Sequence, residues 1–92
     1  MVENKDTMQV MILKSDNVMM DTIYDAKIIR IKDKKYNLLI MKDYWPVIGE
    51  LDGSVYIEAD KNYSYENIKG FYSMSHNKFH LIIQEEGNNS DN

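Results

Sequence analysis

The chain contains no cysteine, and this absence excludes two classes of site. Without thiols it forms neither a disulfide scaffold nor a thiolate metal centre, which fits a reducing compartment. Long apolar runs are also missing, since the segment 38–41 is far too short to span a bilayer. The first seven residues lack the apolar region of a signal peptide. We therefore expect a soluble, cytoplasmic protein.

Motifs for catalysis, cofactors and metals are absent as well. The sequence has no glycine-rich phosphate loop and no serine in a nucleophile elbow. His76 and His80 are four residues apart. On a strand this spacing separates them by about 13 Å at ~3.3 Å per residue, so a shared metal is not expected. The net charge of −4 argues against binding to nucleic acid. These absences predict a protein that is not an enzyme and has no cofactor.

What the chain does contain is strand signal, strongest between Gly70 and Gln84. Phe79, Leu81 and Ile83 repeat with period two, which is the spacing of a strand. The segment 75–78 (Ser-His-Asn-Lys) precedes them and has the composition of a turn, because Ser and Asn bond their own backbone and Asn tolerates positive φ. The pattern predicts a β-hairpin that closes at this turn.

Further strands are expected along the rest of the chain. Residues 8–14 and 18–20 flank a turn cluster and predict a first hairpin. Residues 22–32 predict a strand whose apolar positions change face near Lys27, as at a β-bulge. Asp52-Gly53 is the strongest short hairpin signal and predicts a turn between 47–51 and 54–59. The single proline, Pro46, suits the start of a strand or an edge strand.

These elements predict an all-β fold. We expect a two-sheet antiparallel β-sandwich of about eight to ten short strands, because several strands are apolar on both faces and two packed sheets would bury both. No stretch carries the apolar stripe of an amphipathic helix. The 92 residues predict one domain, ordered over about 7–85, with flexible polar tails at 1–6 and 86–92.

Two segments resemble the N-terminal domain of the F-type ATP synthase epsilon subunit (delta in mitochondria). Residues 45–51 (Trp-Pro-Val-Ile-Gly-Glu-Leu) resemble that family's Ala-Pro-Leu-Ile-x-x-Leu segment. The run from Gly70-Phe71 to Leu81-Ile82 is similar to its Gly-Gly-Phe-x-x-Val-x-x-Asn-x-Val-x-Val-Leu ending. With the opening strands, the similarity spans residues 8–84. The family's β-sandwich docks on the rotary central stalk and rotor ring without catalysis. We expect this protein to lack the family's C-terminal helical hairpin.

The resemblance also has departures, which lie between residues 36 and 46. Both glycines before the family's Ile-Leu pair are replaced, and its histidine position is Tyr44. The glutamate position that faces the rotor ring in the family is Asn37.

The resemblance implies a protein partner, namely a gamma-like shaft subunit and the rotor ring, and only an indirect contact with the membrane through the complex. We expect the partner site at Asn37, Asp43, Tyr44 and Trp45. Two interpretations of Trp45 stay open, a partner anchor or a core residue at the end of the sandwich. The alternative function is a stand-alone protein-binding module with an unrelated partner.

Overall fold

The computed structural model describes residues 7–15 and 18–86, and its regular structure there is entirely β. None of these residues forms a helix that is long and apolar enough to cross a membrane. The predicted tails and the turn residues 16–17 lie outside the described residues, apart from Glu86, which ends the last strand. The strands are β1 (Met8–Lys14), β2 (Met19–Ala26), β3 (Ile28–Asp33), β4 (Asn37–Ile40), β5 (Val47–Glu58), β6 (Asn62–Ser75) and β7 (Lys78–Glu86).

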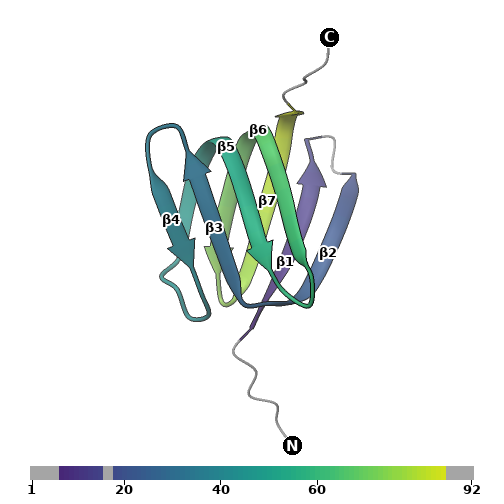
Figure 1. Cartoon of the computed structure of the whole chain (residues 1–92), viewed down its shortest axis with the longest axis vertical. Coiled ribbons are helices and arrows are strands. Elements are labelled where there is room, and N and C mark those ends of the chain that lie inside the picture. The colour runs from purple at the N-terminus through teal and green to yellow at the C-terminus, as the bar shows by residue number, and fades with distance from the viewer. Residues whose placement is uncertain (1–6, 16–17, 87–92) are drawn as a thin grey trace, which may run out of the picture.

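The seven strands form one continuous sheet in the order β2-β1-β7-β6-β5-β3-β4 (Figure 1). All neighbours are antiparallel except β1 and β7, which pair in parallel. The all-β prediction is confirmed. The sheet is mixed, however, so the prediction of purely antiparallel pairing is corrected. Its hydrogen bonding runs through all seven strands, so a sandwich of two separate sheets is not confirmed.

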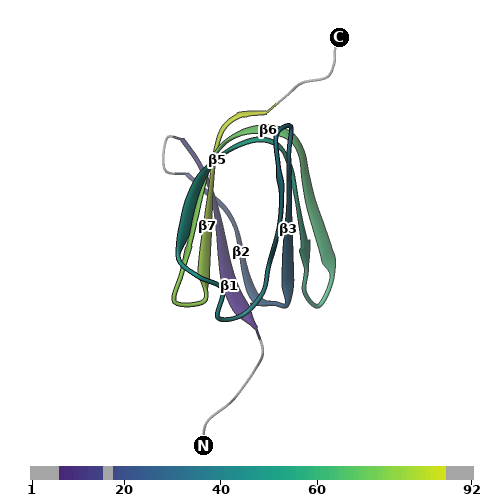
Figure 2. The ribbon, with the colours of Figure 1, turned by 90° about the vertical axis from the view of Figure 1, so that its left-hand side faces the viewer.

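The sheet encloses a core because β5 and β6 are long and bend (Figure 2). The first half of β5 pairs with the second half of β6, on the side of β7, β1 and β2. The second half of β5 pairs with the first half of β6 and with β3. Pairing registers shift after Gly53 in β5 and before Gly70 in β6. These shifts lie where the sheet folds over, and such irregularities increase local twist and bending.

The predicted hairpin turn at Asp52-Gly53 is wrong, since both residues lie inside β5. No described glycine has a positive φ, so Gly53 does not serve a primed turn. A Cβ at this position would instead overlap the backbone carbonyl oxygen of Lys32 on β3. Glycine is therefore required by the close approach of two strands. Because β5 runs through the predicted turn, fewer strands form than expected, and the described residues contain seven strands and not eight to ten.

The predicted strand over residues 22–32 is two strands that separate at Lys27. Ala26 ends β2 at one edge of the sheet, and Ile28 begins β3 next to β5. The Lys27 N–H donates to the carbonyl of Glu58 at 2.7 Å, which fixes this crossing. The change of face seen in the sequence marks the point where the chain passes from one layer to the other.

The hairpin of β6 and β7 is confirmed. Ser75 pairs with Lys78 across the two-residue turn His76-Asn77, whose φ values of 52° and 60° suit a type I′ turn. Phe79, Leu81 and Ile83 share the buried face, as the period of two predicts.

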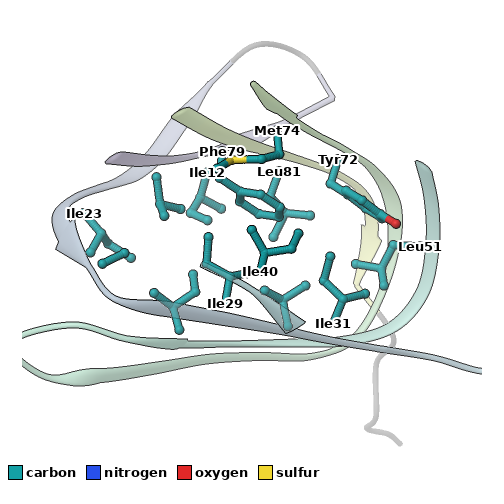
Figure 3. Packing of buried hydrophobic residues seen from close by; sticks show 14 of the residues in the cluster. Ile12, Ile23, Ile29, Ile31, Ile40, Leu51, Tyr72, Met74, Phe79 and Leu81 are labelled. Carbon is teal, nitrogen blue, oxygen red and sulfur yellow. The ribbon is translucent and has the colours of Figure 1, made fainter. Parts of the chain in front are cut away.

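Between the layers lies a core of seventeen apolar side chains with no buried polar residue among the described part of the chain (Figure 3). Ile12 and Leu81 come from the parallel pair β1 and β7, and Ile29 and Ile31 face them from β3. The rings of Tyr72 and Phe79 stack with centroids 5.9 Å apart. Burial of this apolar surface is the main stabilising term of the fold.

Tyrosine hydroxyls bridge the two layers at both edges. Tyr36, just before β4, donates to the carbonyl of Glu50 on β5 at 2.5 Å. Since its one proton is used there, the Tyr72 hydroxyl donates to Tyr36 at 2.9 Å. At the other edge Tyr65 of β6 donates to the carboxylate of Asp21 on β2 at 2.6 Å.

Candidate protein-binding surface

Three of the four predicted site residues, Asp43, Tyr44 and Trp45, lie on the segment that connects β4 to β5. We name this segment, residues 41–46, the Trp45 loop. The backbone N–H of Tyr44 donates to the carbonyl of Met41 at 3.1 Å and closes a turn. Asp43 has a φ of 65°, a left-handed conformation that Asp and Asn tolerate better than most residues. The next residues, Trp45 and Pro46, lead directly into β5, so the proline precedes a strand as its chemistry predicts.

The Trp45 loop is fixed to the β6–β7 turn by a reciprocal pair of hydrogen bonds. The backbone N–H of Asp43 donates to the side-chain oxygen of Asn77 at 2.6 Å, and the Asn77 amide donates to the Asp43 carboxylate at 3.1 Å. Asn77 in turn accepts from the backbone N–H of Gln9 at 2.9 Å. Asp43 therefore anchors the loop to the β6–β7 turn, and this turn is itself bonded to β1.

Trp45 is exposed, with 81% of its surface accessible. Ile48, the second residue of β5, is 82% exposed, and Met41 at the start of the loop is 49% exposed. The interpretation of Trp45 as a plug at the end of the core does not fit this exposure. These three residues lie close together in the sequence, and aromatic anchors such as tryptophan are enriched at interaction sites.

Tyr44 and Asn37 differ from the prediction. Tyr44 is half-buried and packs against the core, so it supports the loop and does not form an exposed pair with Trp45. Asn37 is exposed, but it begins β4, whereas the loop follows the other end of that strand. The four residues of β4 separate the two by about 13 Å at ~3.3 Å per residue. The structure thus brings Asp43, Tyr44 and Trp45 together and leaves Asn37 apart.

Ile48 is the residue that the sequence prediction missed. It alternates with Val47 and Gly49, which face inward, and with Glu50 it faces outward. The alternation of faces along a strand could have revealed the exposure of Ile48. Leu51 is buried, so Val47 and Gly49 share its inward face, and Ile48 lies on the opposite, outward face.

No group of three potential metal ligands exists among residues 7–15 and 18–86. His76 lies in the β6–β7 turn, and His80 pairs with Ser73 in the sheet. The described surface around the Trp45 loop offers apolar and aromatic side chains and no paired nucleophile and base.

Neither a family model nor a characterised protein matches this sequence. Among solved structures, a chain in the cryo-EM structure of the central stalk and c-ring of the Tetrahymena thermophila mitochondrial ATP synthase is similar. The TM-score is 0.64 at 13% identity, and the match covers 90% of this chain and 67% of that chain. At this identity the likeness concerns the fold alone. The chain therefore has a fold related to that of an ATP synthase stalk component.

Proposed function

We propose that this protein is a non-catalytic structural subunit that docks on another protein through the Trp45 loop. The observation that carries the proposal is the 81% exposure of Trp45 on a loop whose backbone is fixed by Asp43 and Asn77. A rigid, exposed indole offers a large contact area, and little conformational entropy is lost when a partner covers it.

The neighbouring side chains extend this anchor. Ile48 and Met41 flank Trp45 in sequence and are exposed as well. Buried aromatic and aliphatic anchors at the centre of an interface dominate its binding energy. Asp43 contributes by holding the loop, and Asn37 belongs to the site only if the partner extends along β4.

The partner that we propose is a gamma-like shaft subunit of a rotary ATP synthase, with the rotor ring beside it. Two independent observations support this partner: the sequence resemblance to the epsilon N-terminal domain over residues 8–84, and the shared fold with a chain of an ATP synthase central stalk and c-ring. In this proposal the protein is cytoplasmic, binds no nucleic acid and meets the membrane only through the complex.

A second candidate function uses the same surface with a different partner. The segment that departs most from the epsilon family, residues 36–46, includes the Trp45 loop. A stand-alone binding module that kept the fold and changed its contact residues would show this pattern.

Co-expression tests the proposal directly. The chain is expressed with the gamma-like subunit from the same genome, and the complex is isolated through a tag on the gamma-like subunit. We expect a stable one-to-one complex, which Trp45→Ala weakens by about 2 kcal/mol or more, the loss typical of a hot-spot residue.

Tyr24→Ala is the matched control, because Tyr24 is also a large exposed side chain but lies on β2, at the edge strand remote in the sheet order from β4. It should leave the affinity unchanged. A complex that survives Trp45→Ala would exclude the loop as the docking site. Absence of any complex would exclude the gamma-like partner and favour the second candidate function.

A further inference from the structure

The first half of β5 is a free sheet edge. On one side, residues 47–53 pair with β6. On the other side, pairing with β3 begins only at Gly53. Residues 47–52 therefore have no neighbouring strand on that side within the described part of the chain. Unpaired strand edges are templates for pairing with another strand, and proteins usually block them with charge, proline or short length.

The β6–β7 hairpin shows which backbone groups point out of this edge. A two-residue type I′ turn is closed by a pair that exchanges both hydrogen bonds, here Ser75 and Lys78. Because such pairs alternate along a strand, Ser73 also bonds to β7, whereas Met74 and Tyr72 bond to β5. Their β5 partners are Val47 and Gly49, so Ile48 directs its N–H and C=O away from β6.

Hydrogen bonds farther along β5 agree with this assignment. The N–H of Asp52 donates to the Asp33 carboxylate at 2.6 Å, and its carbonyl accepts from the N–H of Lys34 at 3.0 Å. The carbonyl of Glu50 accepts from Tyr36. On the same edge, no described residue bonds to the N–H or C=O of Ile48, the N–H of Glu50 or the carbonyl of Pro46.

We propose that this edge pairs with the same edge of a second copy of the chain, antiparallel and about a two-fold axis through Ile48. In this register Ile48 faces Ile48 of the second copy, and Pro46 faces Glu50 of the second copy. A two-fold interface of this kind repeats every contact twice. The dimer joins two seven-stranded sheets along their open edges.

The donors and acceptors match in this register. The two Ile48 residues exchange two hydrogen bonds, and the N–H of each Glu50 donates to the opposite Pro46 carbonyl, which gives two more. Proline has no backbone N–H, so Pro46 offers no donor to the Glu50 carbonyl of the second copy. That carbonyl needs none, because it already accepts a hydrogen bond from Tyr36 of its own chain. Centring the axis on Gly49 would instead aim the Ile48 N–H at that occupied carbonyl.

The side chains agree with the backbone. Ile48, 82% exposed in the single chain, gains an apolar neighbour in its own counterpart. Glu50 lies opposite a proline and not opposite another carboxylate, so no like charges meet directly. The pairing also ends next to Trp45, so dimer formation covers part of the surface proposed for the other partner.

Disulfide trapping tests the register, because the natural chain has no cysteine. Residues that exchange both hydrogen bonds have Cα atoms about 5.5 Å apart, within the range that a disulfide spans. Ile48→Cys should therefore give a cross-linked dimer rapidly under mild oxidation. In the proposed register the two Glu50 residues are four positions apart, about 13 Å at ~3.3 Å per residue. Glu50→Cys should cross-link several-fold more slowly, at the rate of the exposed control Tyr24→Cys.

Sedimentation equilibrium provides the second measurement. The mass of the unmodified chain should rise with concentration from 10.9 kDa towards twice that value. Ile48→Pro removes the outward N–H, a change that an edge position tolerates, and should hold the mass at 10.9 kDa with an unchanged circular dichroism spectrum. The proposal is overturned if the unmodified chain stays monomeric, or if Glu50→Cys cross-links as fast as Ile48→Cys. Both experiments use the purified chain alone, so they succeed or fail independently of the proposed gamma-like partner.

Discussion

Asp43 and Asn77, thirty-four positions apart in the sequence, hold each other in place by two hydrogen bonds of 2.6 and 3.1 Å. Both residues have positive φ, 65° and 60°. One belongs to the Trp45 loop and the other to the β6–β7 turn. The pair therefore connects the tightest local turn of the fold to the loop with the exposed indole, and it explains why an exposed loop has a defined shape.

Asn77→Gly isolates the contribution of this pair. Glycine keeps the positive φ that the turn requires, but it removes both side-chain hydrogen bonds to Asp43. We expect a loss of about 1 kcal/mol in the free energy of unfolding, measured by urea denaturation, together with faster hydrogen exchange at the Asp43 N–H. Asp43→Asn keeps an acceptor for the Asn77 amide and should lose less. Equal exchange rates in all three proteins would show that the pair does not order the loop.

Leu81 provides the test of the core. It is fully buried on β7, so Leu81→Ala should lower the free energy of unfolding by about 2–5 kcal/mol through lost burial and a residual cavity. The neighbouring Ile82 faces outward and is only partly covered. Ile82→Ala is therefore the matched control and should cost less than half as much. Similar denaturant midpoints for the two variants would mean that the assigned faces of β7 are wrong.

The sequence predicted the elements whose causes are local. Residues 8–14 form β1 with the predicted bounds, and the turn at 75–78 joins β6 and β7. In both cases period-two alternation and turn chemistry act over a few residues. The parallel pairing of β1 with β7 joins segments about seventy positions apart, and no pattern in either strand distinguishes a parallel neighbour from an antiparallel one.

Asp52-Gly53 misled because two different physical requirements select the same residue. A primed turn needs glycine for positive φ, whereas β5 needs it for close contact with the carbonyl of Lys32. The site shows the same limit. The sequence located Trp45 beside Pro46, but the exposure of Trp45 and the inward packing of Tyr44 depend on the position of β4, which contacts far along the chain determine.

Gly53→Ala tests the first of these explanations. The added methyl group has only backbone to displace, since its neighbours are the carbonyl and Cα atoms of Lys32 and Asp33. We expect a loss of about 1–3 kcal/mol, the usual cost of overpacking, with thermal melting as the measurement. Ser54→Ala at the next position adds no atom and should change the melting temperature little. A Gly53→Ala protein as stable as the parent would show that β3 and β5 separate easily at this bend.

The last prediction concerns alkaline pH and the two tyrosines that bridge the edges. Burial raises the pKa of Tyr36 well above its ordinary value of 10.0. Burial and the hydrogen bond to Asp21 raise the pKa of Tyr65 in the same direction. Both phenols therefore keep their protons in the folded protein at a pH where the unfolded chain releases them.

The sign of the effect follows from this difference. Below about pH 10 both states hold the phenolic protons, and the stabilisation is fully present. Above that pH the unfolded state gains by ionising while the folded state does not, so the free energy of unfolding should fall as the pH rises through 10 and beyond. Urea midpoints measured between pH 8 and 11.5, a range chosen around the ordinary pKa of tyrosine, should show this decline.

Tyr36→Phe and Tyr65→Phe should start from a lower midpoint at pH 8, because each removes a hydrogen bond, and should decline less steeply. Tyr24→Phe, which removes an exposed hydroxyl of β2, is the control and should follow the parent protein. Parallel declines in all four proteins would mean that the bridging hydroxyls are not the groups that couple stability to alkaline pH.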